Sequence, residues 1–284
     1  MKISTFSLVS FALAASLVAS AEEQGSFDKS LTVSGPVDLD VKTDSGGIMV
    51  TSGSSGTVRV HAILKGQRGW FDSGDVDARI RELERNPPVE QTGNHIRIGY
   101  VHDRDLLKGV SMRLEIETPS NSQLRARADS GGIHVDGIHG PADCRTDSGG
   151  IEIHNVGSEV RAAADSGGIH LSNINGPVSV HVDSGGIEAT GVSGSIDAQT
   201  DSGGIRLAQT RPAAISAKAD SGGVTVKLAP GAGYEISAES DSGRISVPEI
   251  SVNSSFSKHH VEGKVRNGGP LVSIRVASGN ITIE

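Results

Sequence analysis

Charged and imidazole side chains recur along this chain at intervals of 18 residues, as His134, Glu152, His170, Glu188 and Arg206. If each interval returns the chain to the same place on a neighbouring strand, these side chains form an exposed ladder whose members can pair by charge or coordinate a metal ion. The alternation of basic and acidic members favours charge pairing that fixes the strand register. A zinc or copper site made by His134, Glu152 and His170 is the alternative. We take the ladder as a candidate binding surface and expect no metal and no other cofactor.

Aspartate and serine recur at the same interval, within the five-residue repeat Asp-Ser-Gly-Gly-Ile. A repeated acid and hydroxyl could suggest a nucleophile or a calcium site. However, the pair has the same place in every copy, and the calcium-binding β-roll has another residue order and a nine-residue period. We predict that these side chains accept hydrogen bonds from amides just ahead and so close a turn; cation binding by the aspartates is the alternative. The predicted turn residues are Asp129, Gly131, Asp147, Gly149, Asp165, Gly167, Asp183, Gly185, Asp201 and Gly203.

The third residue of the repeat is glycine in all nine copies, including the degenerate copies that begin at Asp241 and Ala277. The fourth residue is less strict, since Arg244 and Asn280 occur there. We predict that the third position requires a positive φ angle or leaves no room for a Cβ atom.

The residues between these turns have the pattern of two short strands. Counting Asp as position 1, apolar or small residues fall at positions 5, 7, 10, 14, 16 and 18, so each strand has one buried face. Polar residues at positions 11 and 17, such as Asn175 and His181, argue against a left-handed hexapeptide helix. The sequence predicts an all-β fold: a single-chain parallel β-solenoid, right-handed, with rungs of about 18 residues and one short helical insertion. Cys144 falls at an inward position and is predicted to lie in the core.

Departures from the period divide the chain. Residues 1–21 contain Lys2, an apolar run and a small-residue cleavage site, the pattern of a secretory signal peptide. Residues 22–284 are predicted to form the solenoid. Its expected parts are a helix-containing insertion at about 61–123, regular rungs at 124–249, and a loop with a capping rung at 250–284.

The insertion has its own pattern. Val76, Ile80 and Leu83 have helical spacing and predict a short helix over 75–85, with Asp72 or Ser73 as its cap. Strands are predicted at 95–100 and 112–118. We expect this segment to cover one end or edge of the solenoid, with Trp70 and Phe71 as anchors, because an open sheet edge favours aggregation.

Composition excludes several classes of protein. The formal net charge is -8, which argues against a nucleic-acid-binding protein. The single cysteine excludes a disulfide framework. No segment after the signal approaches the roughly 20 apolar residues that a membrane-spanning helix needs. We expect an exported protein that is periplasmic, surface-located or secreted and does not span the membrane, with an oligomeric state that the sequence leaves open.

With these repeats in place, the chain resembles a widespread bacterial family of exported "putative adhesins", classed mainly as a domain of unknown function. The hallmark of that family is a run of Ser-Gly-Asp/Gly-Ile turns on a β-solenoid. The resemblance covers residues 31–60, 119–135, the central repeats and 272–283. This chain departs from the pattern by having Gly where Asp often follows the first Gly. The resemblance implies an adhesive or envelope role and supplies no catalytic residues.

The function expected from these observations is that of a non-enzymatic repeat protein that presents a polar solenoid face to a polysaccharide, an envelope component or a surface protein. A carbohydrate-active β-helix enzyme and a metal-dependent envelope scaffold are the alternatives. Variation between the turns is concentrated at positions 6, 8, 15 and 17, where a partner is expected to bind. At position 15, Arg125, Asp143 and Arg161 again alternate in charge and are predicted to pair with one another.

Overall fold

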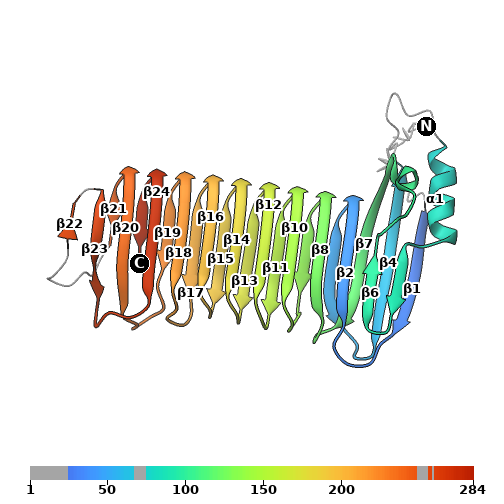
Figure 1. The fold of residues 1–284 in the computed structure, drawn as a ribbon, viewed down its shortest axis with the longest axis horizontal. Helices are drawn as coiled ribbons and strands as arrows, with labels where there is room; N and C mark the ends of the chain where they lie inside the picture. The colour runs from blue at the N-terminus through green and yellow to red at the C-terminus, as the bar shows by residue number, and fades with distance from the viewer. Residues whose placement is uncertain (1–24, 67–74, 248–254, 258) are drawn as a thin grey trace, which may run out of the picture.

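The protein is an elongated stack of β-rungs, shown in Figure 1 as a computed structural model. The structure describes residues 25–66, 75–247, 255–257 and 259–284, with the backbone alone at 255 and 256. The predicted signal peptide, the anchors Trp70 and Phe71, and the predicted helix caps Asp72 and Ser73 lie outside the described residues.

Two long sheets form the flat sides of the stack. The first has 12 strands, in the spatial order β1 (Gly25–Thr32), β4 (Thr57–Gly66), β7 (Val110–Pro119), β3 (Ile48–Gly53), β9 (Ile133–Asp136), β11 (Ile151–Val156), β13 (Ile169–Ile174), β15 (Ile187–Val192), β17 (Ile205–Gln209), β19 (Val224–Lys227), β25 (Ile281–Ile283) and β21 (Ile245–Ser246). The second has 13 strands, in the order β22 (Ser255–Phe256), β23 (His260–Val265), β20 (Tyr234–Ser242), β24 (Leu271–Ser278), β18 (Ile215–Ser221), β16 (Ile196–Ser202), β14 (Val178–Ser184), β12 (Val160–Ser166), β10 (Ala142–Ser148), β8 (Gln123–Ser130), β2 (Asp38–Ser45), β6 (His95–Ile98) and β5 (Val89–Thr92).

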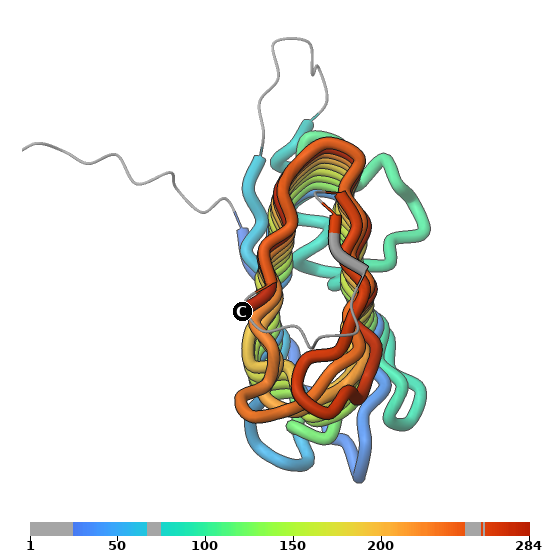
Figure 2. Tube along the Cα trace, turned by 90° about the vertical axis from the view of Figure 1, so that its left-hand side faces the viewer, coloured from blue at the N-terminus to red at the C-terminus, as the bar shows by residue number. Residues whose placement is uncertain are grey.

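Each regular rung contributes one strand to each sheet, and successive rungs pair in parallel and in register. Seen along the axis, the rungs superimpose as a flattened loop (Figure 2). The predicted inward positions are buried in the rung from Asp165, as Ile169, Leu171, Ile174, Val178, Val180 and Val182. The prediction of a parallel β-solenoid with 18-residue rungs is therefore confirmed, whereas the right-handed sense of the coil stays a prediction.

Cys144 lies fully buried between the sheets, as predicted. Burial in this apolar core raises the pKa of its thiol far above its usual value, because the thiolate would lose its hydration there. The cysteine is thus a neutral packing residue.

The glycine corner sets the stacking of the rungs. The amide of Gly149 donates to the carbonyl of Ser166 at 2.9 Å, and that of Ile151 donates to the carbonyl of Gly168 at 3.0 Å. Gly149 also has a φ of +140°, and a Cβ atom there would lie 2.4 Å from the carbonyl oxygen of Gly131. Both reasons predicted for glycine at the third position therefore hold at Gly149.

The insertion covers one end of the solenoid. It adds β7 and most of β4 to the first sheet, where the N-terminal strand β1 pairs with β4, and it adds β6 and β5 to the second sheet. Helix α1 (Val76–Arg85) packs its buried residues Val76, Ile80 and Leu83 against β1 and β4, and a short 3-10 turn, η1 (Arg104–Leu107), lies beside it. The helix is capped by Asp75, whose carboxylate accepts from the amide of Ala78 at 2.9 Å. The helix begins at Val76 with Asp75 as its cap, so the prediction of Asp72 or Ser73 as the cap was wrong.

The other end differs from the expected order. The last two strands, β24 and β25, lie between the rung of β18 and β19 and the rung of β20 and β21. The closing segment of the chain is therefore an internal rung, and the expectation of a terminal capping rung was wrong on this point. The antiparallel strand β23 covers the outer edge of β20 instead.

The corner glycines offer a direct test of this stacking. We expect Gly185→Ala to lower the free energy of unfolding by more than about 2 kcal/mol, because φ is +148° and the new Cβ would lie 2.2 Å from the carbonyl oxygen of Gly167. Its neighbour is the matched control. Gly186→Ala places a Cβ at an ordinary 3.5 Å from the nearest atom and is expected to cost less than about 1 kcal/mol. Chemical denaturation followed by circular dichroism measures both, and equal losses would contradict this account.

Candidate ligand groove on the first sheet

The five predicted ladder residues lie side by side on the outer face of the first sheet. His134, Glu152, His170, Glu188 and Arg206 occupy equivalent positions on β9, β11, β13, β15 and β17, and each is directly opposite the next. Neighbouring strands in a sheet lie about 4.8 Å apart, so adjacent side chains are in reach of one another. The register that the 18-residue period predicted is the one observed.

The contacts divide the ladder into two groups. His134 Nδ1 lies 3.2 Å from Glu152 Oε2, whereas Glu188 lies between His170, at 3.4 Å, and Arg206, at 3.9 Å. Between these groups, Glu152 and His170 form no ion pair in the described structure. Charge pairing along the ladder is therefore real but interrupted.

The residue that interrupts it is His154, which the sequence reasoning missed. It lies two residues after Glu152 on the same face of β11, and its Nε2 is 3.1 Å from Glu152 Oε1. The signal was available, because alternate residues of a strand share a face. His154 occupies position 8 of its rung, one of the variable positions, but the column of residues 18 apart contains Glu152 and not His154.

The two histidines change the chemistry of the carboxylate between them. Hydrogen bonds from His154 and, next, from His134 lower the pKa of Glu152, since both stabilise the ionised form. A hydrogen bond of 2.5 Å joins His154 Nδ1 to the hydroxyl of Ser172 on β13. Both ring nitrogens of His154 therefore have a hydrogen-bonding partner.

Ser172, His154 and Glu152 have the connectivity of a catalytic triad, but not its setting. Hydrolysis by a serine needs hydrogen-bond donors aimed at the oxyanion of the intermediate, and backbone amides beside the serine commonly supply them. Strand β13 pairs with β11 on one side and β15 on the other, so the backbone amides beside Ser172 are engaged in the sheet. This arrangement favours binding over acyl transfer.

The ladder borders a long, open groove, which we call the ladder groove. Two depressions of about 460 Å³ each lie in line on the first sheet and meet at Gly168 and His170. A third depression, of about 510 Å³, continues across β3, β7, β4 and β1 and shares Met49 with the first of the two. The glycines that line the groove are those at the fourth position of the repeat, Gly47, Gly132, Gly150, Gly168, Gly186, Gly204 and Gly223. Absence of side chains at these positions makes the hollow.

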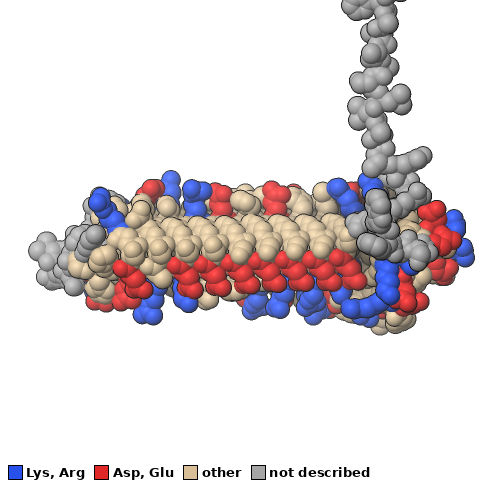
Figure 3. All heavy atoms as spheres, turned by 90° about the horizontal axis from the view of Figure 1, so that it is seen from above, with Lys and Arg blue, Asp and Glu red and all other residues tan. Residues whose placement is uncertain are grey.

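The aspartates form a separate row along the neighbouring corner. Figure 3 shows this red row beside the paler corner of the stack. The members Asp129, Asp147, Asp165, Asp183 and Asp201 are all exposed, and within the described structure none accepts a hydrogen bond from a backbone amide. Backbone bonds between rungs close this corner, so the predicted closure by aspartate side chains was wrong.

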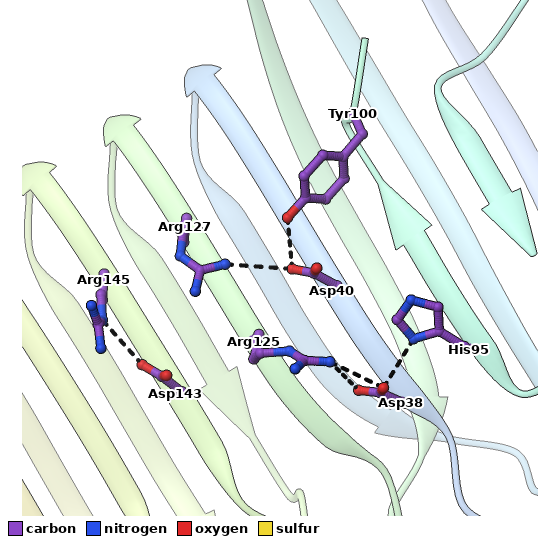
Figure 4. Close-up of polar contacts among 8 residues, drawn as sticks. All are labelled: Asp38, Asp40, His95, Tyr100, Arg125, Arg127, Asp143 and Arg145. Atoms are coloured by element: carbon purple, nitrogen blue, oxygen red, sulfur yellow. Dashed lines mark hydrogen bonds and ion pairs between the residues drawn. The ribbon is translucent and has the colours of Figure 1, made fainter. Parts of the chain in front are cut away.

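A third polar cluster lies on the outer face of the second sheet, where the insertion meets the first rungs (Figure 4). Asp38 on β2 accepts two hydrogen bonds from Arg125 Nη2, at 2.8 and 3.0 Å, and lies 2.9 Å from His95 on β6. Next to it, Asp40 accepts from the hydroxyl of Tyr100 at 2.8 Å. These contacts hold strand β6 against the solenoid.

The prediction that the alternating charges at position 15 pair with one another was wrong. Arg125 pairs with Asp38, Asp143 lies 3.4 Å from Arg145 on its own strand, and Arg161 pairs with Glu159. A long side chain reaches a partner along its strand as readily as one across it. Partner choice therefore does not follow from register alone.

Asp38 has the clearest electrostatic environment of the cluster. Burial alone would raise the pKa of this carboxyl, but the hydrogen bond from Gln123 and the nearby charges of Arg125 and His95 outweigh burial and lower it. The ionised form therefore contributes to the stability of the folded state.

Comparison with known proteins places the chain in a family. A family model matches residues 37–284. The chain belongs to the Toastrack DUF4097 family. The Toastrack DUF4097 match begins just before β2 and includes the insertion, the regular rungs and the inserted last rung. The resemblance seen in the sequence is thus confirmed.

Three solved structures are similar to this Toastrack protein. A "putative adhesin" from Bacteroides fragilis is 16% identical with a TM-score of 0.49, covering 91% of this chain and 97% of that chain. A "putative cell adhesion protein" from Clostridium sporogenes is 13% identical (TM-score 0.27, covering 91% and 98%), and a "putative adhesin" from Parabacteroides merdae is 10% identical (0.30, covering 92% and 96%). No curated protein matches the chain. No helix among the described residues is long and apolar enough to cross a bilayer.

Removing a corner aspartate tests whether its carboxylate supports the turn. We expect Asp165→Ala to leave the melting temperature unchanged or to raise it, because like charges along the row repel and the equivalent place in the last rung is already Ala277. Asp75→Ala is the control. It removes a true helix cap and is expected to cost about 1 kcal/mol. A loss of stability of similar size in Asp165→Ala would show that the Asp165 carboxylate does support the turn.

Neutralising Asp38 tests the cluster on the second sheet. We expect Asp38→Asn to lower the free energy of unfolding by about 1–2 kcal/mol at pH 7. A carboxyl whose pKa is lowered by folding stabilises the protein above its unfolded pKa, and this contribution disappears as pH falls through the folded value. The variant should therefore lose less stability than the wild type between pH 5 and pH 3, a range set by the ordinary aspartate pKa of about 3.9.

Unfolding measured across this pH range provides the comparison. Asp28→Asn is the matched control, because Asp28 lies 2.9 Å from His61 but is 79% exposed. An exposed pair contributes roughly 0–1 kcal/mol. Parallel acid profiles for wild type and Asp38→Asn would show that Asp38 is not a stabilising carboxylate.

Proposed function

We propose that the protein is an exported, non-enzymatic binding protein whose ladder groove holds an extended polymer of the cell envelope, in first place a polysaccharide. The observation that carries this proposal is the groove itself, which repeats similar chemical groups at the rung spacing over successive rungs. A binding surface with translational repetition suits a ligand with translational repetition. Each rung then contributes a weak contact, and the contacts add along the polymer.

The groups that border the groove fit hydroxyl-rich and acidic ligands. Imidazole, carboxylate and guanidinium side chains provide donors and acceptors, and the glycine lining allows a chain to approach the backbone closely. Arg206 is a fixed positive charge at one end of the ladder and is 68% exposed. It can pair with a carboxylate or phosphate on the ligand.

A carbohydrate-active enzyme is the second candidate, and the groove argues against it. A glycosidase needs a carboxylic acid that keeps its proton until it protonates the leaving group, hence a raised pKa. Hydrogen bonds from two imidazoles lower the pKa of Glu152 instead. The carboxylate is thereby disposed to bind and pair rather than to donate a proton.

A binding experiment with matched charge reversals tests the proposal. The purified protein is measured against an array of envelope polysaccharides and against whole bacterial envelopes. We expect Arg206→Glu, in the groove, to weaken binding at least about 10-fold, since it replaces an attraction with a repulsion. Lys218→Glu makes the same change of charge on the second sheet at a residue of similar exposure, 62% against 68%. It should bind like the wild type.

The outcomes separate the groove from other surfaces. Equal weakening of binding by both reversals would indicate an effect of net charge alone. Equal binding by Arg206→Glu and wild type would show that the ladder groove is not the binding site. Hydrolysis of any polysaccharide on the array would favour the enzyme instead. Matching melting temperatures show that the variants are folded.

A further inference from the structure

Three side chains that can bind a metal ion lie close together at the His134 end of the ladder. His134, Glu152 and His154 each offer one ligand atom, and these atoms all lie within 4.8 Å of one another. The two imidazoles contact different oxygens of the carboxylate: His134 Nδ1 lies 3.2 Å from Glu152 Oε2, and His154 Nε2 lies 3.1 Å from Glu152 Oε1. Ligands bound tetrahedrally to zinc at 2.0–2.1 Å are about 3.3 Å apart. Each imidazole therefore already lies at a suitable spacing from one oxygen of the shared carboxylate.

We propose that His134, Glu152 and His154 bind one divalent metal ion of the zinc class. Two imidazoles and one carboxylate are a ligand set that zinc accepts, with water at the remaining position. The strands supply the geometry: Glu152 and His154 share one face of β11, and His134 is directly opposite Glu152 on β9. Binding requires the two rings, whose centroids are 5.6 Å apart, to turn towards a common centre.

The hydrogen bond of His154 to Ser172 prepares the ring for this role. A metal-bound imidazole donates its other N–H to a neighbouring acceptor, which fixes its orientation. The hydroxyl of Ser172 lies 2.5 Å from His154 Nδ1 and can accept that proton. A hydroxyl can also donate, so the same contact persists when Nε2 carries the proton in the metal-free protein.

The partial exposure of the site permits an ion to enter without rearrangement of the core. The side chains of His134 and His154 are 34% and 29% exposed, and that of Glu152 is 56% exposed. The site also differs from the one that the ladder column alone suggested. His170 is directly opposite Glu152, but its Nδ1 lies 3.4 Å from Glu188. His154 takes its place as the third ligand.

Titration of the purified, tag-free protein with Zn²⁺ by calorimetry tests this proposal. We expect one Zn²⁺ per chain, with affinity at least about 10-fold lower in His154→Ala and about 10-fold lower in Ser172→Ala, the usual effect of losing an outer-shell partner. His170→Ala is the matched control, since it removes an imidazole from the same column, and should bind within about 2-fold of the wild type. Bound Zn²⁺ should also raise the melting temperature of the wild type.

Electron paramagnetic resonance with Cu²⁺ adds a structural measurement. Cu²⁺ binds such sites more tightly than zinc. We expect two coupled nitrogens in the wild type and in His170→Ala, and one in His154→Ala. Absence of stoichiometric Zn²⁺ binding would overturn the proposal, as would loss of the site in His170→Ala with retention in His154→Ala. The experiment uses no polysaccharide, so its result is separate from that for the groove.

Discussion

The structure depends on the close approach of successive backbones at the glycine corner. A carbonyl oxygen of one rung occupies the space where a side chain of the next would begin, as between Gly131 and Gly149. This contact, together with the amide-to-carbonyl bonds on either side of it, fixes each rung at one height and in one register. A displacement by one residue would turn every apolar side chain outward, so the apolar core and the corner impose the same register.

Fixed register turns a sequence period into columns, and this is why so much of the fold could be predicted. Residues 18 apart become neighbours, so the buried column headed by Ile133 and the exposed ladder both follow from the sequence. The backbone near the ends of β11 and β13 was harder to predict. Asn155 and Asn173 adopt φ angles of 56° and 57° there, and the Asn173 side chain donates to that of Asn155 at 3.1 Å. Asparagine tolerates this region, but its presence alone does not require it.

Two features could not be predicted, for different physical reasons. The inserted last rung has the same alternation as every other rung, and Ser278 and Gly279 match the corner, so it fits beside any neighbour. Its place between β18 and β20 leaves the outer edge of β20 to the antiparallel strand β23, a pairing that the 18-residue period does not predict. Partner choice among exposed charges is the second feature, because alternatives along and across strands are close in free energy.

Glu152 illustrates this second limit and shows why it matters for function. The column offers it His134 on one side and His170 on the other, and a strict ladder would have it share both. It contacts His134 and His154 instead, because His154 lies on the same strand face and His170 has its own carboxylate in Glu188. The rung spacing thus brings several imidazoles within reach of one carboxylate. The other charged groups beside each imidazole determine which of them pairs with that carboxylate. A repeat that is nearly uniform in its corners and core can in this way carry a single distinct site on its surface.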